Sequence, residues 1–312
     1  MRNAVTSTSA ATPEWFLDVQ VAASDAVYPR NDDAFGHTPR RLWVLDGATG
    51  VSKRRCTRDS SDAAWLAQAA SAWLAADAAP STAQSRSAPM CLYALEGAMT
   101  AAFAEEMAQS GARNVTDVDM PSACLGLVQI EGDHLAMACV GDVTVAVHTP
   151  GGADTTFSDH ASAAASQRTL KTWLAARARG VPDDQLWEQV RPVILKNREE
   201  VNRPGGYRVI HPVRRWASGV PIHHMPLVAG MQVLLASDGL WRLVDLFADM
   251  TAASLMQQLG TPGWPQVLAR LRALEQADAR GERHPRVKCS DDATAVLATV
   301  CRAPQAGHGV QP

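Results

Sequence analysis

The sequence has no close pairs of cysteines. Its 312 residues include six cysteines, and no two of them stand in a C-x-x-C arrangement. A disulfide framework and a structural zinc site both need cysteines at short, regular spacing, so neither is expected. Cys124 and Cys139 lie inside apolar runs, where free cysteine is commonly buried. We therefore predict buried, reduced thiols and no zinc.

Long apolar runs and an excess of positive charge are missing as well. No uncharged apolar stretch of about 18 residues occurs, and the opening MRNAVTSTSAATPEWF lacks the apolar centre of a signal peptide. The formal net charge is −3, and the one basic stretch, RGERHPRVK, is short and has no interleaved aromatic residues. We expect a cytoplasmic monomer with neither a membrane nor a nucleic acid as partner.

What the sequence does contain is enough apolar material for one large core. Hydrophobic residues make up 46% of the chain, and a chain of this length can fold around such a core without disulfides or a structural metal. The two ends, residues 1–13 and 303–312, are small-residue-rich or polar, and we predict that they are flexible tails. A single domain over residues 14–302 remains.

The predicted strands and helices fall in blocks. Strand patterns cover 16–22, 41–45, 123–130, 134–140, 143–149, 206–210, the run before Asp238, and 294–300. Helical patterns cover 59–79, 91–109, 161–179, 185–201, 250–259 and 264–278. The connections between 123 and 149 are too short for a crossover helix, so we predict an antiparallel meander of three strands there. Blocks of this kind indicate an α+β fold of stacked layers.

Aspartates stand where several of these strands begin or end. The full set is Asp32, Asp33, Asp46, Asp142, Asp238 and Asp291. Each one alone is ordinary turn chemistry, because Asp and Gly both favour turns. If they converge, their mutual repulsion would call for a hard divalent cation such as Mg²⁺ or Mn²⁺. Two such ions about 4 Å apart can hold a bridging water for in-line attack on a phosphoryl group.

Five short elements follow one another as NDDAF, VLDGATG, MACVGDVTVAV, LLASDGLWRLVD and SDDATAVLATV. In this order they resemble the N-E-D-A-F, D-G-x-x-G, V-G-D-S-R-x-x-x, L-x-S-D-G-L-W-D-x-V and D-N-x-T-x-x-x-V elements of the metal-dependent protein serine/threonine phosphatases of the 2C type, the PPM family. The resemblance runs from Asn31 to Val300 and is to bacterial-like members. It implies a four-layer α-β-β-α sandwich of two antiparallel sheets flanked by helices, with a metal centre at one edge between the sheets.

The resemblance also implies a first metal site. By position, Asp46 would bridge two Mn²⁺ or Mg²⁺ ions, and the carbonyl of Gly47 would face one of them. Asp238 and Asp291 would complete this site. We take Asp46 and Asp238 as the catalytic carboxylates.

A second and a third ion follow from the same resemblance. Asp32 and Asp33 would hold water ligands of the second ion, and Asp142 matches the position associated with a third, weaker one. Asp292 stands where the family often has Asn, so we do not expect it to be a ligand.

The activity implied is a metal-dependent phosphomonoesterase. It would remove phosphate from phosphoserine or phosphothreonine in a protein substrate, by attack of a water that bridges the two metal ions and without a phosphoenzyme. A small phosphorylated metabolite is not excluded as the substrate.

Two positions depart from the family pattern. Ala48 stands where eukaryotic relatives have a histidine proposed as general acid; His37 or a metal-bound water are the alternatives, although His37 reads as an exposed loop residue. Tyr28 stands where the family has its phosphate-binding arginine, and Arg30 is the nearest substitute, which makes it our third catalytic candidate. The segment REEVNRPGGYRVI falls where the family carries a variable flap, and its Pro-Gly-Gly is either a hinge or a turn.

Two rival interpretations remain open to test. A haloacid-dehalogenase-type phosphotransferase also ends a strand on an aspartate, but it needs D-x-D-x-T, where this chain has Ala48, and it needs a parallel sheet. The other rival is a catalytically weak or dead phosphatase fold that acts as a regulatory or binding module. Ala48 and Tyr28 favour this rival, and the intact Asp46, Asp238 and Asp291 oppose it.

Overall fold

The computed structural model describes residues 15–48, 50–51, 54–78, 86–261 and 263–303. The predicted tails lie outside this part of the chain, apart from Ala303. None of the helices in the described ranges combines the length and the hydropathy that a membrane-spanning helix requires.

In the described residues, ten strands form two five-stranded sheets, and the neighbouring strands pair antiparallel. The first sheet has the order β1-β10-β9-β6-β7, with β1 (Trp15–Asp25), β6 (Thr144–His148), β7 (Thr155–Phe157), β9 (Gln232–Ala236) and β10 (Ala293–Arg302). The second has the order β2-β3-β4-β5-β8, with β2 (Ala34–Thr38), β3 (Arg41–Gly47), β4 (Ala123–Glu131), β5 (His134–Val140) and β8 (Ile222–Pro226). A parallel sheet, which the dehalogenase-type rival needs, is absent from the described residues.

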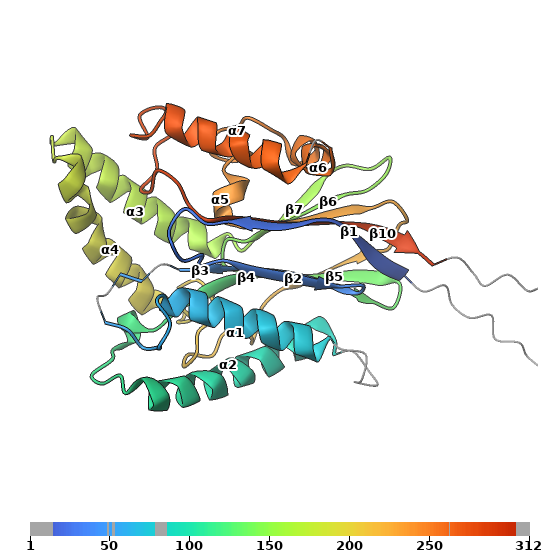
Figure 1. The fold of residues 1–312 in the computed structure, drawn as a ribbon, viewed down its shortest axis with the longest axis horizontal. Coiled ribbons are helices and arrows are strands. Elements are labelled where there is room, and N and C mark those ends of the chain that lie inside the picture. The colour runs from blue at the N-terminus through green and yellow to red at the C-terminus, as the bar shows by residue number, and fades with distance from the viewer. Residues whose placement is uncertain (1–14, 49, 52–53, 79–85, 262, 304–312) are drawn as a thin grey trace, which may run out of the picture.

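The sheets lie face to face with helices on both outer sides (Figure 1). The second sheet is covered by α1 (Asp62–Asp77) and α2 (Ala88–Ser110), and the first by α5 (Asp238–Trp241), α6 (Ala252–Gly260) and α7 (Trp264–Ala277). The predicted four-layer α-β-β-α sandwich is thus confirmed. A further pair, α3 (Ala161–Ala178) and α4 (Leu186–Glu200), lies beyond the left edge of the sheets in Figure 1, with the short 3₁₀ turns η1 (Asp117–Asp119) and η2 (Asp183–Gln185).

Strand β3 shows why the strand sequences are apolar without alternation. Leu42 and Val44 belong to the apolar cluster between the two sheets, whereas Trp43 and Leu45 pack with α1 and α2 on the outer face. Successive side chains of a strand point to opposite faces, and here both faces are covered. A continuous apolar run therefore follows from the layered architecture.

The helix ends carry the expected local signals. The Ser61 hydroxyl accepts a hydrogen bond of 3.3 Å from the Ala64 N–H and caps the start of α1. Gly111 ends α2 in the left-handed conformation, at a φ of 68°. Between these ends both helices are rich in alanine, which has the highest helix propensity.

The predicted three-stranded meander is wrong for its third strand. β4 and β5 form the expected antiparallel hairpin, but β6 belongs to the other sheet, where it pairs with β9 and β7. Gly141, at a φ of 81°, and Asp142 take the chain from one sheet to the other. A short connection excludes a parallel neighbour, yet it does not say which sheet the next strand joins.

Some predicted details differ as well. β2, β7 and β8 have no counterpart in the predicted strands, and the segment 206–210 is not a strand but makes a single bridge between Ile210 and Ala123. His37 is exposed as expected, although it lies within β2 rather than in a loop. Cys124 and Cys139 are buried, as predicted.

Candidate metal centre

Strand β3 carries Asp46 to the edge of the sandwich. Leu42, Val44 and Asp46 share one face of the strand because they are two residues apart. Leu42 and Val44 pack between the sheets, so Asp46 continues the inner face and meets the other sheet at its edge. A strand that looks buried therefore ends on a carboxylate between the two sheets.

Strand register places further aspartates beside Asp46. Ala34 pairs with Leu45, which sets Asp33 next to the end of β3. Ala295 pairs with Ala236, so the residues before β10 and those after β9 meet at the same edge of the first sheet. This pairing brings Asp291 and Asp238 together.

The carboxylates act on one another electrostatically across the sheets. Burial raises the pKa of Asp46 well above its ordinary value, and Asp33, Asp238, Asp142 and Asp291 raise it further. Burial also raises the pKa of Asp33 to about 8 and that of Asp238 to about 7, with other aspartates adding to each shift. Five of the six predicted metal-binding aspartates thus converge in one place.

Asp46 and Asp238 stand out among the described carboxylates of the centre. Among the described residues, no hydrogen bond reaches the carboxylate oxygens of either side chain. A buried carboxylate is stable only with donors, a counter-charge or a proton. Their environment therefore fits a bound cation.

Asp33 is held by a polar chain that joins the two sheets. The Thr294 hydroxyl donates to Asp33 Oδ2 at 2.6 Å, and the Ser24 hydroxyl lies 2.7 Å from that of Thr294. The Asn31 side chain donates to the Ser24 hydroxyl at 2.7 Å and accepts from the Asp33 N–H at 2.9 Å. Thr294 and Asn31 belong to the quoted motifs, although we gave neither a role from sequence. The sequence signal that could have pointed to them is their place in these motifs, Thr294 in D-N-x-T and Asn31 in N-E-D.

Asp32 and Gly47 are in backbone contact. The Gly47 N–H donates to the Asp32 carbonyl at 3.2 Å, and a Cβ at position 47 would lie 2.4 Å from that oxygen. Only glycine allows this approach, which sets Asp32 beside the end of β3. The Asp32 carboxylate accepts a hydrogen bond from Ser61.

Asp292 has a structural role. Its carboxylate accepts hydrogen bonds from the backbone N–H groups of Val27 and Asp32, at 2.9 and 2.8 Å. It therefore fastens the loop before β2 to the start of β10. Both of its oxygens take part in these hydrogen bonds.

Asp291 has counter-ions from the chain itself. Lys288 Nζ lies 3.0 Å from Asp291 Oδ1, and Arg242 Nη2 lies 3.1 Å from Asp291 Oδ2. Burial lowers the pKa of Lys288, but Asp291, Asp238 and Asp46 outweigh burial and leave it above its ordinary value. Sequence reasoning assigned nothing to Lys288 or Arg242.

The donor chemistry of this centre fits a hard divalent cation. Carboxylates and a backbone carbonyl are the ligands that Mg²⁺ and Mn²⁺ prefer, and soft ligands are not needed. No group of three or more His, Cys, Asp or Glu side chains in the described part of the chain is spaced as a ready-made metal site. The ligand roles of Asp32, Asp33, Asp46, Gly47, Asp142, Asp238 and Asp291 thus stay predictions.

Several solved structures are similar to this fold. The catalytic domain of the serine/threonine protein phosphatase PstP, in complex with two manganese ions, matches 92% of this chain and 100% of its own at 18% identity and a TM-score of 0.52. The fold is that of the PPM phosphatases. PstP/Ppp of Mycobacterium tuberculosis matches at 17% identity, covering 92% and 98% of the two chains, with a TM-score of 0.51. PppA, a key regulatory component of the T6SS in Pseudomonas aeruginosa, matches at 16% identity, covering 92% and 100%, with a TM-score of 0.50.

At these identities the likeness shows the PPM fold and not the activity. No protein-family model matches the chain, and no curated protein matches it. The resemblance inferred from the five motifs is therefore confirmed for the fold.

Arg30, Tyr28 and His37 are the residues that bear on the missing arginine and the missing acid of the PPM pattern. Arg30, the proposed phosphate-binding residue, pairs with Asp59 at 2.7 Å, and 43% of its side chain is exposed. Tyr28 is exposed on the same loop. His37 pairs with Leu42, at the end of β2 that is remote from Asp33, so it does not reach the centre.

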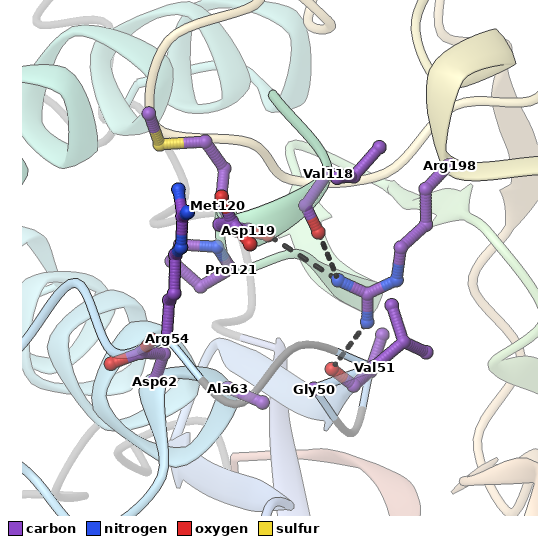
Figure 2. A pocket seen from close by; sticks show the side chains of 11 residues that line it. Gly50, Val51, Arg54, Asp62, Ala63, Val118, Asp119, Met120, Pro121 and Arg198 are labelled. Atoms are coloured by element: carbon purple, nitrogen blue, oxygen red, sulfur yellow. Dashed lines mark hydrogen bonds between the residues drawn. The ribbon is translucent and has the colours of Figure 1, made fainter. Parts of the chain in front are cut away.

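Helix α4 is fastened to the loop that follows β3 in this PPM fold. Arg198 Nη2 donates to the carbonyl of Ala48 at 3.1 Å, and its Nη1 donates to that of Val118 at 3.4 Å. Arg191 donates to the Val51 carbonyl at 3.3 Å. Figure 2 shows the Arg198 guanidinium among the residues that line a small pocket, which Arg54 also lines. Ala48 thus has no side chain that could act as a general acid, and its backbone carbonyl accepts a hydrogen bond from Arg198.

The Pro-Gly-Gly segment that follows α4, in REEVNRPGGYRVI, is a tight turn. Gly205 has a φ of 82°, and a Cβ at Gly206 would lie 1.9 Å from the carbonyl oxygen of Glu200. The Gly206 N–H donates to the Arg203 carbonyl at 2.9 Å. The segment is packed onto the end of α4, which favours the turn over the hinge.

The raised aspartate pKa values predict that the metal-free protein loses stability between pH 6.5 and 8. Asp33, at about 8, and Asp238, at about 7, hold protons in the folded state that they release at an ordinary pKa of 3.8 in the unfolded state. Raising the pH therefore favours unfolding, by on the order of 2 kcal/mol over this window. Below pH 6.5 the buried His211, whose pKa burial lowers to about 4, acts in the opposite direction.

Urea unfolding in EDTA at several pH values in this window checks the sign. Excess Mn²⁺ should flatten the slope, because a bound cation removes the need for the protons. A stability that rises with pH in EDTA would contradict the burial of ionisable aspartates at this centre.

Proposed function

We propose that this protein is a metal-dependent phosphatase that removes phosphate from phosphoserine or phosphothreonine in other proteins. The observation that supports this proposal best is the cluster of buried carboxylates around Asp46, at the edge between the two sheets of a PPM fold. Among the described residues, no hydrogen-bond donor contacts the carboxylate of Asp46 or Asp238. Such a cluster has no stabilising role of its own, because the carboxylates repel one another. It is suited to holding cations.

The residues divide into ligands and supports. Asp46 and Asp238 would hold the ions, together with Asp32, Asp33, Asp142, Asp291 and the Gly47 carbonyl. When bound, the ions would supply Lewis acidity toward a phosphoryl oxygen and activation of a water. Thr294 keeps the Asp33 carboxylate in place through its 2.6 Å hydrogen bond.

Arg30 is the candidate for binding the phosphate of the substrate. Its guanidinium is partly exposed, and its Asp59 partner is at the surface, so such an ion pair contributes little to stability. A phosphate dianion can compete for the same planar fork of donors. The loop that carries Arg30 is fastened at both ends by Asp292, through Val27 and Asp32.

The activity should depend entirely on Mn²⁺ or Mg²⁺. Hydrolysis of a chromogenic aryl phosphate, and release of phosphate from phosphoserine and phosphothreonine peptides, should fall to the background rate in EDTA and return when Mn²⁺ is added. The physical reason is that the carboxylates alone offer no electrophile and no activated water. Full activity after complete metal removal would refute the proposal.

A non-catalytic regulatory or binding module is the second candidate. Ala48 in place of an acid and the counter-ions on Asp291 favour it. The aryl phosphate separates the two, because its phenolate leaves without a general acid. Mn²⁺ binding without turnover of this substrate would support the binding module, whereas turnover would support the enzyme.

A further inference from the structure

Helix α7 carries a carboxylate on its buried face. Val267, Leu271 and Glu275 follow one another at a spacing of four residues, so they share one face of the helix, and all three are buried. Val267 and Leu271 belong to an apolar cluster, whereas the Glu275 side chain brings a charge to this face with only 1% of it exposed. Buried ion pairs are a poor means of stabilising a fold, because apolar side chains of similar volume often do as well or better. The partners of Glu275 suggest another role.

Each carboxylate oxygen of Glu275 holds an arginine. Oε1 accepts a hydrogen bond of 3.1 Å from Arg242 Nη1, and Oε2 accepts one of 2.8 Å from Arg272 Nη1. Arg272 also donates from Nη2 to Asp25 Oδ2 at 2.9 Å. Glu275 therefore fixes two guanidinium groups at once, one on each of its oxygens.

The same two arginines reach Asp291. Arg242 Nη2 donates to Asp291 Oδ2 at 3.1 Å, and Arg272 Nη1 donates to the backbone carbonyl of Asp291 at 2.9 Å. One arginine thus holds the carboxylate of this residue, and the other holds its backbone. The quoted PPM motif has Asp where this chain has Arg242, so the contact is a feature of this chain.

The hydrogen bond from Arg242 is compatible with a metal ion on Asp291. A carboxylate offers about four lone-pair positions on its two oxygens, so an oxygen that accepts a hydrogen bond can also bind a cation. Carboxylates that bind metals are themselves hydrogen-bonded as a rule, and such bonds keep the ligand oriented. Arg242 can orient Asp291 in this way because it is only 10% exposed and is held from the other side by Glu275.

We propose that Glu275 is a positioning residue of the metal centre, which acts through Arg242 to hold the Asp291 carboxylate in the orientation that binds a divalent ion. The inference rests on the proposed function, because it concerns the ions of that same centre. Arg242 has two opposite effects on such an ion, since its charge repels the ion while its hydrogen bond orients the ligand. The proposal requires that the orienting effect is the larger one.

Calorimetric titration of the metal-free protein with Mn²⁺ compares the two effects. In Arg242→Gln the repelling charge is gone, so charge alone would make Mn²⁺ bind more tightly. We expect the opposite, a loss of about tenfold or more in the affinity for at least one ion, because the shorter side chain no longer joins Glu275 to Asp291. Tighter or unchanged binding in the folded variant would overturn the inference.

Arg270→Gln is the matched control for this variant. It makes the same change on α7, but 54% of the Arg270 side chain is exposed and its partner is Asp249. The Mn²⁺ affinity should therefore stay as in the native protein.

Glu275→Gln tests the remote residue itself. The amide oxygen can accept from only one of the two arginines, so the Mn²⁺ affinity should fall about ten- to a hundredfold. Glu282→Gln, where 62% of the side chain is exposed, is the control and should leave the affinity unchanged. A merely structural role of Glu275 would lower the melting temperature and leave the Mn²⁺ affinity of the folded variant as it was, which would contradict the proposal.

The double variant Arg242→Gln/Glu275→Gln shows whether Glu275 acts through Arg242. If it does, Glu275→Gln should add a much smaller loss of Mn²⁺ affinity to Arg242→Gln than it causes alone. An equally large further loss would mean that Glu275 acts directly through its charge, and the inference would be wrong. The double variant removes both charges of the pair, so it keeps the test open if Glu275→Gln alone, with a buried arginine left unpaired, does not fold.

The two proposals fail in different ways. Mn²⁺-dependent turnover in the native protein, together with an Arg242→Gln variant that binds Mn²⁺ at least as well, overturns the positioning role and leaves the phosphatase standing. Weaker Mn²⁺ binding in the variants of a protein that hydrolyses no phosphate ester supports the positioning role and counts against the enzyme. If the native protein binds no Mn²⁺, both proposals are wrong.

Discussion

Replacing Asp46 or Asp238 by asparagine is expected to lower turnover at least about a hundredfold, the scale on which the loss of a preorganised electrostatic partner is felt. Asparagine keeps the shape and the turn propensity of aspartate, but it removes the charge that faces the cations. The free energy of unfolding in EDTA should be unchanged or higher, because the buried cluster has lost one repelling carboxylate. Steady-state kinetics, Mn²⁺ calorimetry and urea unfolding measure the three effects.

Asp133→Asn is the matched control for these variants. Asp133 lies in the turn between β4 and β5, and 85% of its side chain is exposed, so the same chemical change there should alter neither turnover nor Mn²⁺ affinity. Near-normal turnover and unchanged Mn²⁺ binding in Asp238→Asn would mean that the strand-end aspartates are only turn residues. The proposed phosphatase activity would then have no basis.

Gly239→Ala is expected to destabilise the protein by about 3 kcal/mol or more, at the upper end of what overpacking costs. A Cβ at position 239 would lie 1.9 Å from the carbonyl oxygen of Asp292 and 3.0 Å from its carbonyl carbon. This neighbour is backbone and cannot rotate away, so α5 and the start of β10 must move apart. Asp238 and Asp291 would separate with them, and the activity should be lost as well.

Gly97→Ala is expected to change the free energy of unfolding in the opposite direction. Gly97 is exposed in the middle of α2, and a Cβ there would meet nothing within 4 Å. Alanine should stabilise this helix by about 0.5–1 kcal/mol, because glycine is the weaker helix former. Urea unfolding of both variants gives the comparison. A Gly239→Ala protein as stable as the native one would show that the tight approach at Asp292 is not real.

The sequence motifs predicted the sandwich and the gathering of aspartates, because strand ends are where a sheet presents side chains. They also suggested turn chemistry as the reason for Gly47 and Gly239, and here the structure differs. Neither glycine has a positive φ; both allow backbone segments to approach at distances that exclude a Cβ. A contact between segments distant in the chain leaves no local pattern, so turn propensity was the only cue available.

The counter-ions of Asp291 were missed for a related reason. Lys288 is three residues from Asp291, but this spacing predicts a contact only in a helix, and the segment is not helical. Arg242 reaches Asp291 from the far end of α5, and the quoted motif has Asp where this chain has Arg242. Nothing in the sequence indicated that β6 joins the first sheet. A short connection restricts the relative direction of two strands, but it does not determine which sheet the second strand joins.

The polar chain from Asn31 through Ser24 and Thr294 to Asp33 has a mechanical consequence. Two sheets that meet only through apolar side chains can slide over one another, since dispersion and hydrophobic contacts have little directional preference. The hydrogen bonds of this chain have direction, and they cross from the first sheet to the entrance of the second. Sliding of the sheets at this edge would have to bend or break these hydrogen bonds, so the chain opposes shear beside Asp33.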